Sequence, residues 1–176
     1  MHGSCTYLSW RLDRIDVKVV VCLAAIAALL QSAASSVGAS GTAEPALDVG
    51  APRTRIQLVV DELRGRLALA EAVDVTLVPH NPLLVSVSTP LPGHTAYRLS
   101  FEAGFAETLD SHELSAVVAH ELGHIWIYTH HPYLQTERLA NRIALRVVER
   151  PVLERVYEKV WKRSGQKGDL SRFIAP

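Results

Sequence analysis

The chain has 176 residues, a length that suits one domain with a tail and can bury a core without disulfide or metal staples. Hydrophobic residues make up 48% and charged residues 20%, which excludes a mainly disordered or collagen-like chain. Eighteen basic residues balance eighteen acidic ones, so the overall charge favours no nucleic-acid partner.

Residues 1–39 have the layout of a secretory signal. Basic residues precede a wholly apolar run over 19–30, and small residues follow it. A membrane-spanning helix needs about twenty apolar residues, more than this run supplies. We therefore predict a cleaved signal peptide and a secreted or periplasmic protein. The alternative is an uncleaved anchor formed by residues 17–34, which would associate the protein with a membrane.

Both cysteines, Cys5 and Cys22, lie in this N-terminal segment. The chain that remains after cleavage would contain no thiol. It would therefore form no disulfide and would have neither a cysteine nucleophile nor a thiolate metal ligand.

The following segment is predicted to begin with a flexible lead-in over 40–52, rich in Ala, Gly and Pro. Apolar residues at spacings of three and four predict an amphipathic helix over 53–70. Alternating, β-branched stretches over 73–78 and 83–88 predict a pair of short strands, and 96–101 is a third strand candidate.

Three helices are expected in the second half of the chain. The first begins at Asp110, with Glu113 completing a capping box, and runs to about Tyr128. A second is predicted over 136–149, and a third from Pro151 to Trp161. The expected fold class is α+β, with a short three-stranded antiparallel or mixed sheet packed on an N-terminal helix and a helix pair. The domain spans 53–163, and a frayed polar tail follows over 164–176.

The motif that carries chemistry is His120-Glu121-Leu122-Gly123-His124, an H-E-x-x-H sequence on a predicted helix. The two histidines lie roughly 40° apart around the helix axis, so both imidazoles can reach one metal ion. Glu121 is placed to accept a proton from a metal-bound water as general base. The composition predicts only about 0.02 such motifs by chance, and small Gly123 would allow close packing against the helix. We predict one Zn²⁺ per chain.

Two residues compete as the third zinc ligand. His130 has the spacing of H-E-x-x-H-x-x-G-x-x-H, but that pattern needs a glycine where Ile127 stands, to turn the chain out of the helix. The same class requires a methionine turn, and the only methionine is Met1. Glu137 is the better candidate, because it begins the next helix after a loop that can fold back. His130 stays the alternative ligand.

Asn141 lies one turn after Glu137 on the same helix face. A residue there can orient a ligand histidine by accepting its second N–H, and the Asn carbonyl is a neutral and weaker acceptor than an aspartate. No residue is singled out to stabilise the oxyanion of a hydrolytic reaction. The equal candidates for that role are Tyr128, His131, Tyr133 and Arg142.

At these residues the sequence resembles the HtpX-like and CAAX-prenyl-protease family of gluzincin zinc metallopeptidases. Residues 113–125 follow the family pattern E-L-x-A-V-x-A-H-E-x-G-H almost position for position, and 137–144 resembles its E-x-x-A-D-x-x-A helix. The resemblance covers about 53–150 and implies a minimal zincin-like domain with Glu137 as zinc ligand. It also implies that 96–101 is the edge strand that pairs with an extended peptide substrate.

Three departures from the family stand out. Asn141 replaces the family aspartate, the gap between His124 and Glu137 is only twelve residues, and the membrane spans of larger relatives are missing. The sequence therefore predicts an exported zinc metalloendopeptidase that acts on peptide or protein substrates and binds no nucleic acid. The alternative is a catalytically weak zinc-binding relative that acts as a binding or chaperone-like module.

Overall fold

The computed structural model describes residues 51–165 and 168–174. The predicted signal or anchor over 1–39 lies outside these residues, as does nearly all of the lead-in over 40–52. Within the described residues, no helix combines the length and the apolar character needed to cross a membrane. The elements in chain order are α1 (Pro52–Arg66), β1 (Val73–Val78), β2 (Val85–Ser88), β3 (Tyr97–Glu102), α2 (Ala103–Ala106), α3 (Ser111–His130), η1 (Pro132–Leu134), α4 (Glu137–Ala144), α5 (Arg150–Ser164) and α6 (Leu170–Phe173).

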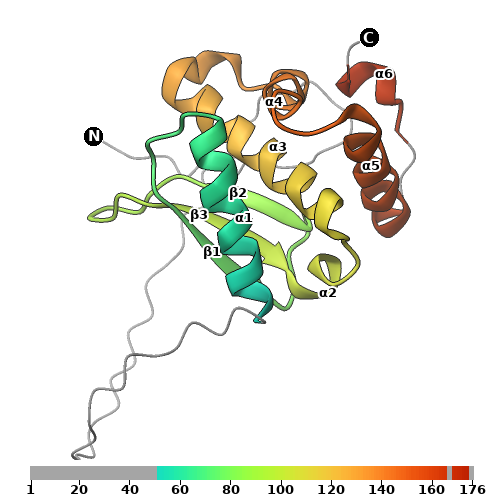
Figure 1. Ribbon diagram of the computed structural model, residues 1–176, viewed down its shortest axis with the longest axis horizontal. Helices are drawn as coiled ribbons and strands as arrows, with labels where there is room; N and C mark the ends of the chain where they lie inside the picture. The colour runs from blue at the N-terminus through green and yellow to red at the C-terminus, as the bar shows by residue number, and fades with distance from the viewer. Residues whose placement is uncertain (1–50, 166–167, 175–176) are drawn as a thin grey trace, which may run out of the picture.

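The three strands form a mixed sheet in the order β1-β3-β2, which confirms the predicted α+β class and the mixed sheet (Figure 1). β3 runs parallel to β1, with Val73 opposite Tyr97, and antiparallel to β2, with Val85 opposite Phe101. β1 and β2 therefore do not pair with each other, and the implied edge position of 96–101 is wrong. Leu99 and Phe101 are fully buried in this central strand.

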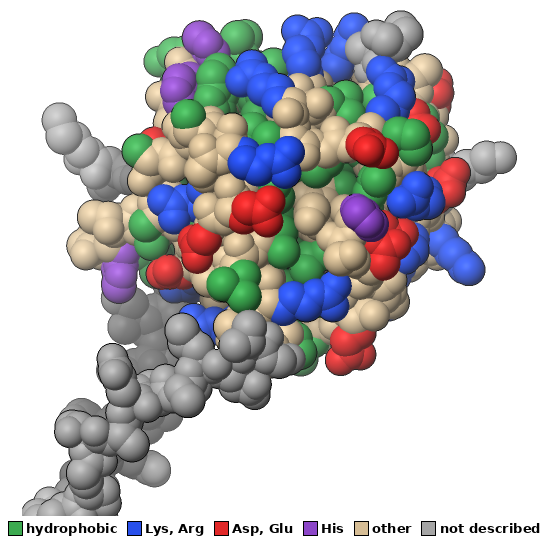
Figure 2. Space-filling model, viewed as in Figure 1, with side chains coloured by type: hydrophobic (Ala, Val, Ile, Leu, Met, Phe, Trp, Pro, Cys, Tyr) green, Lys and Arg blue, Asp and Glu red, His purple; other side chains and the backbone are tan. Residues whose placement is uncertain are grey.

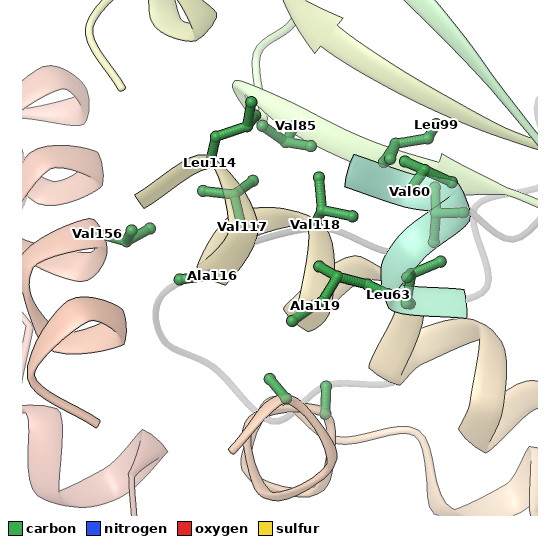
Figure 3. Close-up of a cluster of buried hydrophobic side chains, with 14 of the residues drawn as sticks. Val60, Leu63, Val85, Leu99, Leu114, Ala116, Val117, Val118, Ala119 and Val156 are labelled. Atoms are coloured by element: carbon green, nitrogen blue, oxygen red, sulfur yellow. The ribbon is translucent and has the colours of Figure 1, made fainter. Parts of the chain in front are cut away.

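Helix α3 lies at the centre of the molecule, in contact with α1, β2, η1, α4 and α5. It begins with the predicted capping box: the Asp110 carboxylate accepts from the Glu113 N–H, and the Glu113 carboxylate accepts from the Asp110 N–H. Small and branched side chains cover its sides (Figure 3). Around it gather Val60 and Leu63 from α1, Val85 and Leu99 from the sheet, and Val156 from α5. A helix buried on several sides cannot shift without disturbing the whole core.

The helices after α3 differ from the prediction at one boundary. The chain was expected to stay helical to Glu149, but α4 ends at Ala144 and a turn follows. A helix running through this point would set the ring of Pro151 against the carbonyl of Val147. That carbonyl instead accepts a hydrogen bond from Arg66 at 2.8 Å, which ties the turn to the end of α1.

The C-terminal tail is more ordered than its polar composition suggests. Residues 170–173 form α6, and Ile174 after it is only 3% exposed. Phe173 stacks on Tyr157 of α5 with ring centroids 5.5 Å apart. The expectation of a frayed tail is therefore wrong for the described residues 168–174, because Phe173 packs on Tyr157 and Trp161 of α5 and Ile174 is buried.

The surface on the α1 side of the molecule is polar and carries both charges. Acidic and basic side chains are interspersed over this face (Figure 2). Two ion pairs on α1, Asp61 with Arg64 and Glu62 with Arg66, are exposed and contribute little to stability. The free energy of folding therefore comes mainly from the apolar contacts around α3.

Candidate metal centre

The two histidines of the H-E-x-x-H motif lie on the buried face of α3. His120 is fully buried, His124 is 4% exposed, and Glu121 between them is 1% exposed. The start of α3 is tied to α5 by Lys159. This α5 side chain donates to the Thr108 carbonyl, just before α3, and to the Glu113 carboxylate in its first turn. The motif thus sits in a fixed helix whose neighbours are already packed.

Glycine at position 123 brings α4 up to the motif. A Cβ atom at Gly123 would lie 2.6 Å from the backbone oxygen of Ala140, closer than any real Cβ contact. The absence of a side chain there lets α4 lie directly against α3. The predicted close packing at Gly123 is therefore confirmed, and its result is that Glu137, the first residue of α4, faces the two histidines.

Substitution of Gly123 by alanine should lower the free energy of unfolding of the metal-free chain by about 1–3 kcal/mol, because the added methyl overpacks the α3–α4 contact. Urea denaturation measures this change. Gly65 in α1 provides the control, since a Cβ there meets nothing within 4 Å. Gly65→Ala should be stabilising by about 0.5–1 kcal/mol through helix propensity. Equal stability of Gly123→Ala and the wild-type chain would contradict the close approach.

Three electron-pair donors converge between α3 and α4. The Nε2 atoms of His120 and His124 are 3.1 Å apart. The Glu137 carboxylate places Oε2 3.2 Å from Nε2 of His120 and Oε1 3.5 Å from Nε2 of His124. Among the described residues these three form a group with metal-ligating atoms within 4.8 Å of one another.

The distances and the chemistry of this group fit zinc. A tetrahedral ion with Zn–N bonds of 2.0–2.1 Å holds its ligand atoms about 3.3 Å apart, which is close to the three separations in the cluster. Two histidines and one carboxylate are a donor set of catalytic zinc sites. Lone pairs that face one another this closely repel unless a proton or a metal cation lies between them. The site is therefore built around a positive charge.

The titration behaviour of the site agrees with a cation-binding role for Glu137. Burial acts to raise the pKa of its carboxyl group, but the hydrogen bonds and charges of His120 and His124 outweigh it and lower the pKa to about 2. For His124, burial acts to lower the pKa, yet the Glu137 carboxylate, aided by Glu121 and Gln135, raises it. Glu137 is therefore ionised at neutral pH, as a metal ligand must be.

Asn141 fixes the tautomer of His120. The Asn141 Nδ2 atom donates to the Tyr157 hydroxyl at 2.6 Å and to the Phe173 carbonyl at 3.0 Å. Its Oδ1 therefore points the other way and lies 2.7 Å from Nδ1 of His120. Nδ1 must carry the proton, so Nε2 keeps its lone pair for a metal.

Gln135 and Tyr157 are site residues that sequence reasoning missed. Gln135 donates to the His124 backbone carbonyl at 3.2 Å, and its Oε1 lies 3.5 Å from Nδ1 of His124. Gln135 lies just before α4, in the short loop that returns the chain from α3 so that Glu137 faces the histidines. The length of that loop does not indicate that one of its side chains contacts His124. Tyr157 lies on a different helix, and only the tertiary fold places its hydroxyl behind Asn141.

The alternative ligand His130 is not brought to this cluster. Because Ile127 continues the helix, His130 is the last residue of α3 and is exposed. Its ring stacks on Trp126 with centroids 4.2 Å apart, and its Nδ1 lies 2.9 Å from the Trp126 carbonyl oxygen. The structure thus gathers His120, His124 and Glu137 and leaves His130 on the surface.

A small hollow adjoins the cluster on the sheet side. It is lined by Val87, Ser88, Thr89, Tyr97, His124, Ile125 and Tyr128. Tyr128 is thus the one oxyanion candidate of the four that lines this hollow. His131, Tyr133 and Arg142 are exposed side chains elsewhere, with Tyr133 98% exposed. Burial, with smaller effects from Tyr128 and Glu71, raises the pKa of Tyr97 to about 12, so its hydroxyl stays protonated.

The edge of the sheet beside this hollow is β2. The Leu84 carbonyl accepts from Glu102 on β3, so alternate residues 84, 86 and 88 direct their backbone groups toward β3. The backbone N–H and C=O groups of Val87 therefore point away from the sheet. In the described part of the chain no strand pairs with β2 on that side.

Comparison with known proteins adds little to this picture. The chain matches no family profile and no curated protein by sequence. Among solved structures it is similar to the crystal structure of a metallopeptidase zymogen, abylysin from Pyrococcus abyssi. That similarity has a TM-score of 0.45 and 11% sequence identity, and it covers 65% of this chain and 99% of the other. The assignment of the site rests on the residues themselves.

Proposed function

We propose that this protein is a zinc-dependent metalloendopeptidase, with one Zn²⁺ held by His120, His124 and Glu137. The observation that carries the proposal is the convergence of these three ligand atoms within 4.8 Å, beside a buried glutamate on the same helix turn. A purely structural zinc site is closed by four protein ligands. Three ligands leave a position for water, which is the arrangement of hydrolytic sites.

A side chain of the protein, Glu121, is proposed to carry out the proton transfer. Bound zinc would contribute Lewis-acid polarisation and would lower the pKa of a water molecule to near neutrality. Glu121 would act as the general base: its carboxylate would take a proton from the attacking water and deliver it to the leaving amine of the substrate. Glu121 directly follows His120 on α3 and is 1% exposed, which supports a role beside the cluster.

An extended peptide fits the open edge of β2. The outward N–H and C=O of Val87 can pair with a substrate backbone in the manner of an added strand. The small hollow with Tyr97 and Tyr128 on its wall lies beside this edge. β2 therefore takes the substrate-pairing role that the family resemblance implied for 96–101. Export of the protein from the cytoplasm, with or without a membrane anchor, is proposed from residues 1–39 alone.

A catalytically weak zinc-binding module is the second candidate. The neutral Asn141 behind His120 favours it, because an amide makes the histidine a poorer electron donor than a carboxylate would. Such a protein would bind zinc in a one-to-one ratio without turning over any peptide.

Hydrolysis of a mixed peptide library distinguishes the two candidates. We expect the zinc-loaded full-length chain to cleave internal peptide bonds, a chelator to stop cleavage, and added zinc to restore it. Mass spectrometry identifies the products and therefore the cleavage positions. One equivalent of bound zinc with no cleavage would establish the second candidate. Cleavage that survives complete removal of metal would contradict both.

A further inference from the structure

Asn141 occupies a site that is built for an amide. Three hydrogen bonds hold its side chain: Oδ1 lies against His120, and the two Nδ2 hydrogens go to the Tyr157 hydroxyl and the Phe173 carbonyl. Asn141 is 1% exposed, so no bulk water completes these contacts. A buried side chain held by three hydrogen bonds in different directions keeps a single orientation.

An aspartate could not make the same three contacts. The Phe173 carbonyl can only accept hydrogen bonds, and it lies 3.0 Å from Nδ2 of Asn141. A carboxylate oxygen in the place of Nδ2 would face that carbonyl oxygen without a proton between them. Two buried oxygens in this position repel, which costs free energy or turns the side chain away from His120.

The Phe173 carbonyl, which requires a donor at position 141, belongs to the C-terminal segment 168–174. This segment is held by its own packing, since Phe173 stacks on Tyr157 and Ile174 is buried. Phe173 and Asn141 are 32 residues apart in the chain. The last helix therefore reaches back to the residue that orients a metal-ligating histidine.

We propose that the C-terminal segment 168–174 contributes to the zinc affinity of the metal centre, because the Phe173 carbonyl helps to orient Asn141 toward His120. Asn141 and Tyr157 are then positioning residues: together with that carbonyl they fix the orientation of the His120 ring. Asn141 is therefore required in this fold, and aspartate weakens the site. The inference rests on the proposed metal centre, but it is independent of peptide hydrolysis.

Zinc affinity of the full-length chain tests this directly. Competition with a chromophoric chelator gives the Kd, and the visible spectrum of the cobalt-loaded protein reports the ligand geometry. Asn141→Asp should weaken zinc binding by about 10- to 100-fold, as loss of a partner behind a ligand histidine does. Tyr157→Phe keeps the ring packing but removes one acceptor, and should weaken binding by roughly tenfold. Both should alter the cobalt spectrum.

Asn81 provides a matched control for the chemistry of the substitution. It is a buried asparagine, 8% exposed, and its Nδ2 donates to the Ser100 carbonyl and the Ser86 hydroxyl. Asn81→Asp should lower thermal stability while leaving the zinc Kd and the cobalt spectrum unchanged. If Asn141→Asp fails to fold without metal, the Kd of Tyr157→Phe decides the question.

Shortened chains test the role of the carbonyl. A chain ending at Arg172 lacks the Phe173 carbonyl together with the Phe173 ring and Ile174 that position it, whereas one ending at Ile174 keeps all three. We expect weaker zinc binding only in the first, and a smaller effect of Asn141→Asp there than in the full chain, because the repulsion is gone. Folded Asn141→Asp that binds zinc as tightly as the wild type would overturn the inference. Absence of zinc binding by the wild-type chain would overturn the metal centre as well.

Discussion

Replacement of Glu121 by glutamine should lower the kcat of peptide hydrolysis by about 10²- to 10⁴-fold, the contribution expected of a general base. The amide has the size of the carboxylate but cannot accept a proton at neutral pH. Glu121 is not one of the three residues whose ligand atoms converge, so the variant should keep one equivalent of zinc. Loss of turnover with the metal retained separates proton transfer from metal binding.

Measurement of kcat alongside zinc content and thermal stability makes this test specific. Glu158 is exposed on α5 and serves as the control, since Glu158→Gln makes the same chemical change away from the site and should keep full activity. A Glu121→Gln variant that keeps its zinc and loses less than about tenfold in kcat would show that another group takes the proton.

Glu137→Ala should all but abolish zinc binding. The substitution removes one of three ligand atoms and leaves two imidazoles whose Nε2 atoms are 3.1 Å apart. Removal of a residue that only hydrogen-bonds to a metal ligand lowers metal affinity by about 10- to 100-fold. Because Glu137 is itself a ligand, its removal should lower the affinity for zinc by more than this. Isothermal titration of the metal-free protein with zinc, in competition with a chelator, measures it.

His130→Ala is the paired control for this prediction. His130 stacks on Trp126 at the surface end of α3, so its removal should leave zinc affinity within a factor of two or so of the wild type. If His130→Ala abolished zinc binding and Glu137→Ala did not, the third ligand would be His130 and α3 would have to bend after His124.

The parts of the site that follow from local chain geometry could be predicted from the sequence. The spacing of His120 and His124 places both rings on one helix face, and Gly123 between them indicates a close neighbour. Glu137 was preferred over His130 because Ile127 cannot make the required turn, and the continuous α3 agrees with that reason. These features depend on residues a few positions apart.

The parts that depend on distant packing could not be predicted. The order of the strands depends on pairing between segments far apart in the chain, and β3 lies between β1 and β2 although the sequence implied an edge position for it. The orientation of Asn141 depends on Tyr157 from α5 and on a carbonyl of α6, a segment whose polar sequence suggested a frayed tail. No periodicity of the sequence records such contacts, because they join elements that meet only in the folded chain.

The most direct measurement of the central claim is anomalous diffraction at the zinc absorption edge from crystals of the protein grown with zinc. We expect one peak per chain, within about 2.0–2.2 Å of Nε2 of His120, Nε2 of His124 and a carboxylate oxygen of Glu137. No anomalous peak between α3 and α4, or a peak bound by His130 in place of Glu137, would contradict the proposed metal centre.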